Sequence, residues 1–168
     1  ITVGEINEET FLRKGLDRFI QVAEKMKDIQ FFHIGKWTDN QGRTNSKMIE
    51  YVKSISPSNI HYLGFIDNKE LEKYYEESKI YLQLSRHEAF GVSVVEAMSK
   101  GCFPIVSKEY ALPEIVGDYG ECVNWDITQI ICEIENGFKN NDIDGLIKQS
   151  KKFSVEKRYR HFKALINT

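Results

Sequence analysis

The chain alternates short apolar runs with longer segments in which apolar residues recur every three or four positions. Such runs are typical of buried β-strands, and such periodic segments are typical of amphipathic helices. The runs predict strands at residues 1–4, 29–35, 59–64, 79–84, 102–107 and 120–123. The periodic segments predict helices at residues 11–26, 47–53, 68–78, 91–100 and 110–116, and from 127 onward. This alternation predicts an α/β fold, a Rossmann-like doubly wound parallel sheet of about six strands with helices on both faces.

The carboxyl ends of the strands are the expected place for a ligand, because such folds bind ligands there. The loop after the fourth strand is the most informative, since it leads into a helix that begins near Gly91. Glycine lets the backbone approach a ligand closely, and the unpaired N–H groups of a helix N-terminus bind phosphate. Gly101 is expected to end this helix as a C′ residue.

Two carboxylates bracket the start of this helix. Glu88 lies in the loop before the helix. Glu96 lies in the second turn, roughly 7–8 Å along the axis from the start of the helix at about 1.5 Å per residue. Glu96 has apolar sequence neighbours, and burying an acid there is costly unless it meets hydrogen-bond donors. A ligand with hydroxyls at both ends and phosphate in the middle would satisfy both acids and the helix. Nucleoside diphosphate sugars are ligands of this kind.

The segment from Glu88 to Met98, Glu-Ala-Phe-Gly-Val-Ser-Val-Val-Glu-Ala-Met, resembles the E-x7-E signature of retaining glycosyltransferases of the GT-B architecture, especially family four. The resemblance implies that Glu88 contacts the hydroxyls of the donor sugar and that Glu96 holds the ribose hydroxyls. It also implies that amides near Phe90, Gly91 and Val92 face the diphosphate. An ordinary amphipathic helix with a solvated Glu96 is the alternative that remains without the surrounding matches.

The resemblance extends over most of the chain. Gly4 with Lys14-Gly15 resembles the first β-α unit of the family, and 62–66 resembles its third strand and nucleobase loop. Leu112–Val116 resembles the loop that lies over the donor sugar. The resemblance therefore implies that Lys14 acts with Glu88 in catalysis, and it adds donor contacts from the residues Gly64, Phe65, Ile66 and Leu112.

Glu5 departs from the family pattern. Members usually carry Arg after the first-strand glycine, and a carboxylate there would repel a diphosphate. Arg13 could supply the missing cation, because a guanidinium binds phosphate bidentately, or it could be an ordinary charge on a helix surface. Tyr110-Ala111 stands where the family often has two glycines, which predicts a different sugar pocket.

Composition and charge narrow the classes of partner. The chain has 168 residues, which is the length of one domain. Its formal net charge is −2, so it lacks the basic character typical of proteins that bind nucleic acid. No apolar run approaches the ~20 residues that cross a bilayer. Three cysteines without C-x-x-C spacing favour reduced thiols in the cytoplasm. The basic segment 151–166 carries an apolar stripe that could meet the inner face of a membrane or dock on its own sheet.

The expectation is a single domain over 1–168, the donor-binding, C-terminal half of a GT-B enzyme. The chain opens as a strand already under way, so its expected partner is an N-terminal acceptor domain of the same polypeptide. The resemblance implies transfer of a sugar from a nucleoside diphosphate sugar to a hydroxyl acceptor with retention, without metal or cofactor, and little turnover by this domain alone. The alternative that stays open is a non-catalytic scaffold or partner-binding domain in which Glu5 has abolished donor binding. The Glu-x-Phe-Gly sequence speaks against a related GT-B enzyme such as an epimerase, and the sequence offers no acidic phospho-acceptor cluster for a doubly wound signalling domain.

Overall fold

The computed structural model describes residues 1–39, 41–154, 156–157 and 163. Six strands form within this part of the chain, each inside a predicted run, and every pair of adjacent strands is parallel. The strands are β1 (Thr2–Val3), β2 (Phe31–Ile34), β3 (Ile60–Gly64), β4 (Ile80–Gln83), β5 (Phe103–Ser107) and β6 (Glu121–Val123). The α/β class predicted from the sequence is confirmed.

The strands divide into two parallel sheets, in the orders β1-β2-β3 and β4-β5-β6. The two sheets meet at Ile1, whose amine donates to the Ile80 carbonyl at 2.9 Å and whose carbonyl accepts from the Leu82 N–H at 2.9 Å. Read across this junction, the strand order is β3-β2-β1-β4-β5-β6, which is the Rossmann order. The single predicted sheet is thus divided in two, because β1 has only two residues and little backbone with which to pair to β4.

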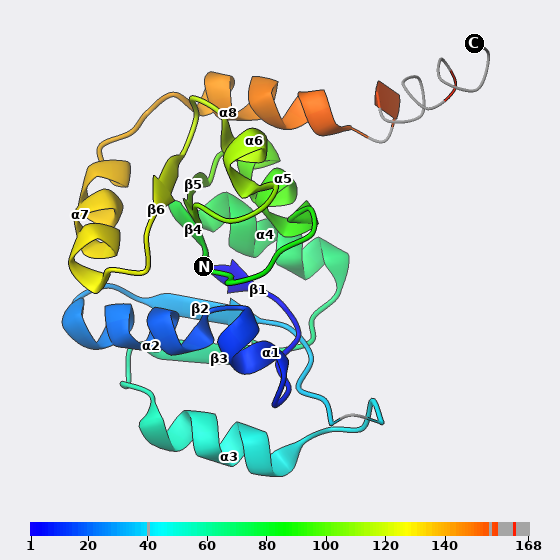
Figure 1. Cartoon of the computed structure of the whole chain (residues 1–168), viewed down its shortest axis with the longest axis vertical. Helices are drawn as coiled ribbons and strands as arrows, with labels where there is room; N and C mark the ends of the chain where they lie inside the picture. The colour runs from blue at the N-terminus through cyan, green and yellow to red at the C-terminus, as the bar shows by residue number, and fades with distance from the viewer. Residues whose placement is uncertain (40, 155, 158–162, 164–168) are drawn as a thin grey trace.

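Helices surround both sheets, and Figure 1 shows the β1–β3 half below the β4–β6 half, with β1 at the boundary. The described helices are α1 (Thr10–Arg13), α2 (Leu16–Lys25), α3 (Ser46–Ile55), α4 (Asn68–Glu77), α5 (Val92–Ser99), α6 (Leu112–Val116), α7 (Ile127–Gly137), α8 (Ile143–Ser150) and the 3₁₀ helix η1 (Lys151–Phe153). None of these described helices is long and apolar enough to cross a membrane.

Side-chain caps explain why four of the helices begin where they do. The Asp67 carboxylate caps α4 by accepting from the Glu70 N–H at 2.8 Å. Asp126 does the same for α7 at 2.8 Å, and Asn45 and Asp142 cap α3 and α8. Each cap satisfies an N–H that has no partner inside the helix.

The helix predicted over 11–26 is broken in two at Gly15. Gly15 has φ 72°, and a Cβ at this position would lie 1.9 Å from the Leu84 carbonyl oxygen. The backbone after α1 therefore rests directly on the end of β4, and only glycine permits that approach. The helix predicted from Tyr110 also begins later, at Leu112, because Tyr110 has φ 52°, outside the helical region.

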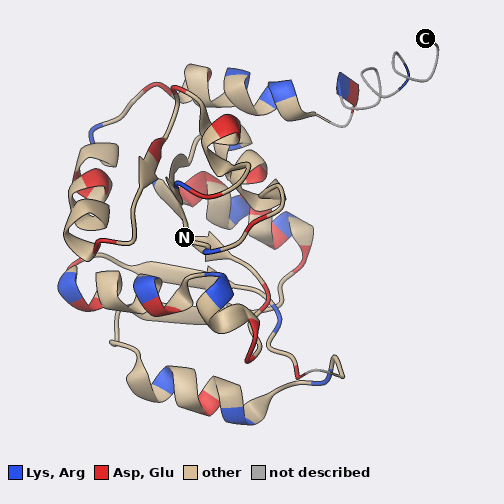
Figure 2. Ribbon diagram, in the orientation of Figure 1, with Lys and Arg blue, Asp and Glu red and all other residues tan. Residues whose placement is uncertain are grey.

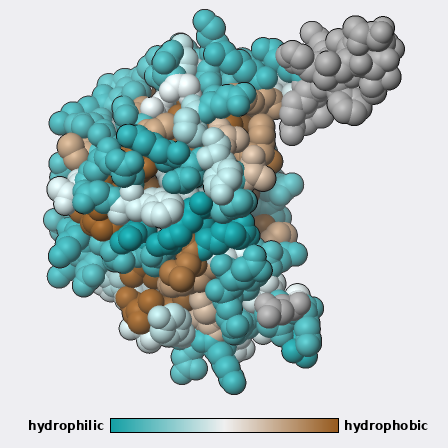
Figure 3. All heavy atoms as spheres, in the orientation of Figure 1, coloured by the Kyte–Doolittle hydropathy of each residue, from teal (hydrophilic) through white to brown (hydrophobic). Residues whose placement is uncertain are grey.

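The core lies between the sheets and their helices. Its largest fully buried side chains belong to both halves of the molecule and include Phe19, Tyr75, Tyr81, Leu82, Met98 and Ile105. Basic and acidic residues intermix on the helices that surround it (Figure 2), and the face in Figure 3 is largely hydrophilic with apolar patches between the polar groups. The apolar stripe predicted within 151–166 rests on Val155, Tyr159, Phe162 and Ile166, which lie outside the described residues.

Candidate functional site

Lys14 and Glu88 meet at the carboxyl edge of the sheets. The Lys14 ammonium donates to Glu88 Oε2 at 2.6 Å, and the two side chains are only 26% and 12% exposed. Lys14 follows α1 and Glu88 follows β4, so the contact joins the two halves of the molecule. The sequence assigns both residues to the site, and the structure brings them together.

A chain of polar groups that begins in β4 holds Glu88. Gln83 Nε2 donates to Glu88 Oε2 at 3.1 Å and to Ser85 Oγ at 2.7 Å. The Tyr81 hydroxyl donates to Gln83 Oε1 at 2.8 Å and lies 2.7 Å from Ser93 Oγ on α5. Because Tyr81 and Gln83 are buried, this network fixes the carboxylate from beneath. Sequence analysis did not identify Gln83; its signal is a polar residue inside an otherwise apolar run.

Arg86 anchors the loop of Glu88 to the loop of Lys14. Its guanidinium donates to both carboxylate oxygens of Asp17, at 2.8 and 2.7 Å, and to the Leu12 carbonyl. Its backbone N–H donates to the Arg13 carbonyl at 2.8 Å. The hydrogen bonds to Asp17 raise the pKa of Arg86. The sequence does not predict these contacts, because Arg86 and Asp17 lie 69 positions apart in the chain.

Gly91 begins α5 in the left-handed region, with φ 83°. A Cβ there would lie 2.8 Å from Leu112 Cδ2, so Leu112, which is fully buried, supports Gly91 from below. Among the described residues no side chain caps this N-terminus, which leaves the first N–H groups of α5 available to an anion. Val92 at the first position of α5 is 52% exposed, and Phe90 packs on Phe153, with ring centroids 5.9 Å apart.

Glu96 lies in different surroundings from Glu88. Its side chain is exposed, and its carboxyl is 3.4 Å from the Tyr75 hydroxyl of α4. Partial desolvation raises the pKa of Glu96, against the opposing effect of the Tyr75 hydrogen bond. Glu96 lines a groove of about 180 Å³ between α4 and α5, together with Asn68, Leu71, Glu72, Tyr75, Ser99 and Lys100.

The loop after β3 presents an aromatic ring. Gly64 turns the chain with φ 71°, and Phe65 follows it with 70% of its surface exposed. The Lys36 ammonium lies 4.9 Å from the Phe65 ring centroid, which is within cation–π range. Ile66 is half-buried and packs against the core.

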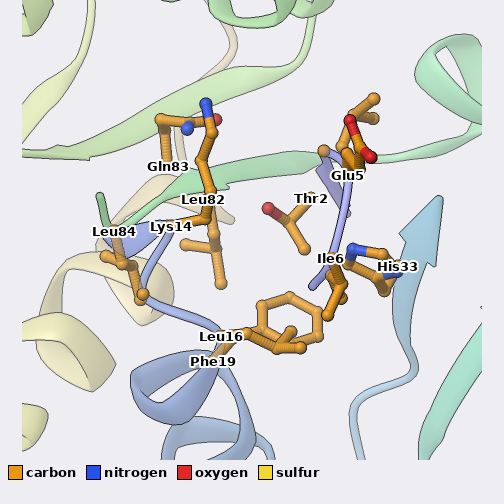
Figure 4. Close-up of a pocket in the computed structure, with 13 residues that line it drawn as sticks. Thr2, Glu5, Ile6, Lys14, Leu16, Phe19, His33, Leu82, Gln83 and Leu84 are labelled. Carbon is orange, nitrogen blue, oxygen red and sulfur yellow. The ribbon is translucent and has the colours of Figure 1, made fainter. Parts of the chain in front are cut away.

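Glu5 is exposed at the end of β1, and its carboxylate accepts a hydrogen bond from the Thr38 hydroxyl. Figure 4 shows Glu5 and Lys14 on opposite sides of a small pocket, with the Lys14 ammonium near Gln83. Arg13 is 36% exposed, and its Nε lies 3.9 Å from the Glu9 carboxylate. Arg13 is thus placed near the site with an acidic neighbour of its own.

The arrangement can bind an anion and hydroxyl groups together. Lys14 and the first turn of α5 offer a positive charge and N–H donors, which suit a phosphate. Glu88 and Glu96 offer hydrogen-bond acceptors on either side of that turn. Among the described residues, no group of three or more His, Cys, Asp or Glu side chains is placed to hold a metal ion.

The chain matches a known protein family over most of its length. The model of a family described as "Glycosyl transferases group 1" matches residues 3–160, which is most of the chain and includes every residue of the site.

Curated relatives resemble parts of the chain. A 41.2 kDa uncharacterized protein in the cps region of Klebsiella pneumoniae is 32% identical over 124 residues, which cover 73% of this chain and 32% of the relative. The 2-deoxystreptamine N-acetyl-D-glucosaminyltransferase of Niallia circulans is 32% identical over 113 residues, which cover 64% of this chain and 28% of that enzyme. O-antigen chain mannosyltransferase B of Escherichia coli is 38% identical over 61 residues, or 36% of this chain and 16% of that enzyme. The chain therefore spans about a third of such relatives or less.

Solved structures share the fold. The crystal structure of S. aureus TarM in complex with fondaparinux, alpha-GlcNAc-glycerol and UDP superposes with a TM-score of 0.76 at 18% identity, over 99% of this chain and 35% of TarM. The structure of WaaG, a glycosyltransferase involved in lipopolysaccharide biosynthesis, superposes with a TM-score of 0.64 at 15% identity, over 90% of this chain and 42% of WaaG. At these identities the likeness concerns the fold alone.

Proposed function

Because the chain belongs to the glycosyl transferases group 1 family, we propose that it is the donor-binding domain of a retaining glycosyltransferase of the family-four type. The full protein would transfer a sugar from a nucleoside diphosphate sugar to a hydroxyl acceptor. The observation that carries the proposal is the contact between Lys14 and Glu88 at 2.6 Å, beside the uncapped start of α5. This cation, this acid and this helix N-terminus are what a sugar diphosphate requires.

Each group has one role in the proposal. Lys14 and the N–H groups at the start of α5 stabilise the negative charge that develops on the leaving diphosphate. Glu88 exchanges its bond with Lys14 for bonds to the sugar hydroxyls. Glu96 binds the ribose hydroxyls from α5, and the exposed Phe65 ring with the backbone of its loop receives the nucleobase. Neutralisation by Lys14 removes the need for a metal ion, so activity should survive a chelator.

The rest of the enzyme completes the reaction in this proposal. The chain covers 35% of TarM and 32% of its Klebsiella relative, which leaves room for an N-terminal acceptor domain in the same polypeptide. This domain alone should bind the donor and turn over little, because the acceptor would bind between the two domains. The three free cysteines fit a reducing cytoplasm, and a lipid acceptor would bring the protein to the inner face of the membrane.

Calorimetric titration of this chain with UDP, GDP, ADP and their common sugar conjugates tests the proposal. We expect one base to bind, and we expect Lys14→Ala to weaken that binding about 10- to 100-fold, as for a lost hydrogen bond to a charged group. Glu96→Ala should weaken it as well. Lys47→Ala, which removes an exposed lysine from α3, is the matched control and should bind as the wild type does.

A non-catalytic scaffold is the second candidate, and Glu5 is the observation that favours it. Its exposed carboxylate at the end of β1 opposes a diphosphate. If no nucleotide binds at millimolar concentration, either to this chain or to the two-domain protein, the result would support the scaffold and contradict the donor-binding proposal.

A further inference from the structure

Tyr110 has a backbone conformation that calls for an explanation. Among the described residues it is the one non-glycine residue with positive φ, at 52°. Tyrosine is disfavoured there, and residues held in such conformations cluster at functional sites. Its side chain is 60% exposed, so burial of the ring in the core does not account for its position.

The loop that carries Tyr110 is fastened to the loop that carries Glu88. The Ser107 hydroxyl donates to the Ser85 carbonyl. The Leu112 side chain fills the space beneath Gly91. These contacts lie on either side of Tyr110 in the chain, so its backbone is held from both directions.

The Tyr110 ring lies against His87, with ring centroids 4.2 Å apart and an interplanar angle of 54°. His87 is exposed as well, and it directly precedes Glu88. The two rings therefore form an exposed aromatic surface next to the carboxylate of the site. An aromatic ring carries negative charge density on its face, which attracts the C–H groups of another molecule.

We propose that Tyr110, supported by His87, is a specificity-determining residue that packs against the apolar face of the donor sugar ring. The inference rests on the proposed function, in which Glu88 binds the hydroxyls of the same sugar. A pyranose presents hydroxyls at its edge and C–H groups on its face, so a carboxylate beside an aromatic ring matches both. Tyr supplies this surface at a low entropic cost because it has few rotatable bonds.

Tyr110→Gly removes the aromatic ring without straining the backbone, so it tests the role of the ring apart from the stability of the fold. Glycine adopts φ 52° without strain, so this variant should unfold at the same temperature as the wild type or higher. Tyr110→Phe keeps the ring and is the matched control. The probes are UDP, GDP and ADP and their glucose, galactose and mannose conjugates, titrated calorimetrically into each variant.

The expected result is a selective loss. Tyr110→Gly should weaken the sugar conjugate about fivefold to tenfold, as for the loss of one aromatic contact, and leave the bare nucleotide unchanged. Tyr110→Phe should bind both ligands as the wild type does. In NMR spectra of the bound conjugate, the sugar C–H protons should shift upfield with wild type and not with Tyr110→Gly.

Two results would overturn the inference, and they can be told apart. If the wild type binds a sugar conjugate and Tyr110→Gly weakens the conjugate and the bare nucleotide equally, or neither, the ring does not read the donor sugar. If the wild type binds no nucleotide at all, the donor site itself is absent and the inference fails with it.

Discussion

Glu5 is the residue whose charge most directly opposes the proposed ligand. It is exposed at the end of β1, and its hydrogen bond with Thr38 leaves its negative charge in place. The structure also places it across the pocket from Lys14 (Figure 4). The strength with which Glu5 repels a diphosphate therefore depends on the distance between the two charges and on screening by the solvent.

Replacing Glu5 by Gln should strengthen the binding of a nucleoside diphosphate by about threefold to tenfold at low salt, because a neutral amide removes one repulsive charge. The gain should shrink as ionic strength rises. Titration calorimetry at two salt concentrations measures it. Thr38→Val removes the hydrogen bond and keeps the charge, so it should not reproduce the gain. Unchanged or weaker binding by Glu5→Gln would show that Glu5 does not oppose the ligand.

His33 gives the fold a dependence on pH. It is buried in β2 beside Trp37 and Tyr62, and burial lowers its pKa to about 4 from the ordinary value of 6.5. The unfolded chain therefore takes up a proton first as the pH falls. The stability of the folded chain should decrease between about pH 6.5 and pH 4, by on the order of 3 kcal/mol.

His33→Phe tests this dependence, because phenylalanine keeps an aromatic ring and cannot take up a proton. Urea unfolding at pH 7 and at pH 4.5 gives the two free energies of unfolding. The difference between them should be about 2–3 kcal/mol smaller for His33→Phe than for the wild type. Equal differences would mean that His33 is not the group that titrates.

At the scale of elements, the start of α5 depends on Gly91 for two separate reasons. Its φ of 83° disfavours any side chain, and Leu112 occupies the place of a Cβ. Gly42 has a similar φ of 76° with open space around it. The two glycines therefore separate backbone strain from steric conflict.

Gly91→Ala should destabilise the protein by about 2–4 kcal/mol, and Gly42→Ala by about 1 kcal/mol, since only the first adds overpacking to strain. Chemical denaturation of both variants measures the difference. Leu112→Ala costs stability by itself, because this side chain is fully buried. Its cost should be smaller in the Gly91→Ala background, and the difference between the two costs measures the steric part. Equal losses at the two glycines would contradict the packing described here.

The Arg86–Asp17 pair joins two other elements, the loop after β4 and α2. Both side chains are largely buried, at 27% and 16% exposure, and the contact is bidentate. A double-mutant cycle with Arg86→Met and Asp17→Asn should give a coupling energy of about 1–3 kcal/mol. Additive losses of stability would instead show that each residue acts independently of the other.

The sequence predicts elements well where the signal is local. The apolar runs are such signals, and the structure has a strand inside each of them. The break at Gly15 is not local, because the apolar residues keep one periodicity through 11–26 and the cause of the break is the Leu84 carbonyl. Gln83 and Arg86 were not predicted as site residues for the same reason, because the fold brings their partners to them from other elements. The family resemblance assigns both Lys14 and Glu88 to the site, but it does not predict their contact with each other, and neither residue alone predicts it.

At the scale of the whole molecule, the two halves meet along a seam at Ile1. The Leu82 N–H donates across it to Ile1, and the Arg86 N–H donates across it to Arg13. Within the second half, the Arg86 guanidinium lies 5.1 Å from the Trp125 ring. Lys14 and Glu88 face each other over this seam, so a ligand held by both should draw the halves together.

Hydrogen exchange can detect this effect. With a bound nucleotide at ten times its dissociation constant, exchange of the Leu82 and Arg86 amides should slow about tenfold. The Gly35 amide, which donates to Gly64 within the first half, should slow less. If all three slow alike, the ligand stabilises the chain as a whole and not the seam.

The contact of Lys14 with Glu88 also bears on turnover. The Lys14 ammonium lies 2.6 Å from the Glu88 carboxylate, so under the proposed function a diphosphate that binds Lys14 must displace Glu88. In the same proposal, Glu88 can pair with Lys14 again after the sugar has been transferred. Under the proposed function, breaking this ion pair should therefore lower the affinity for the diphosphate and speed the release of the nucleotide product.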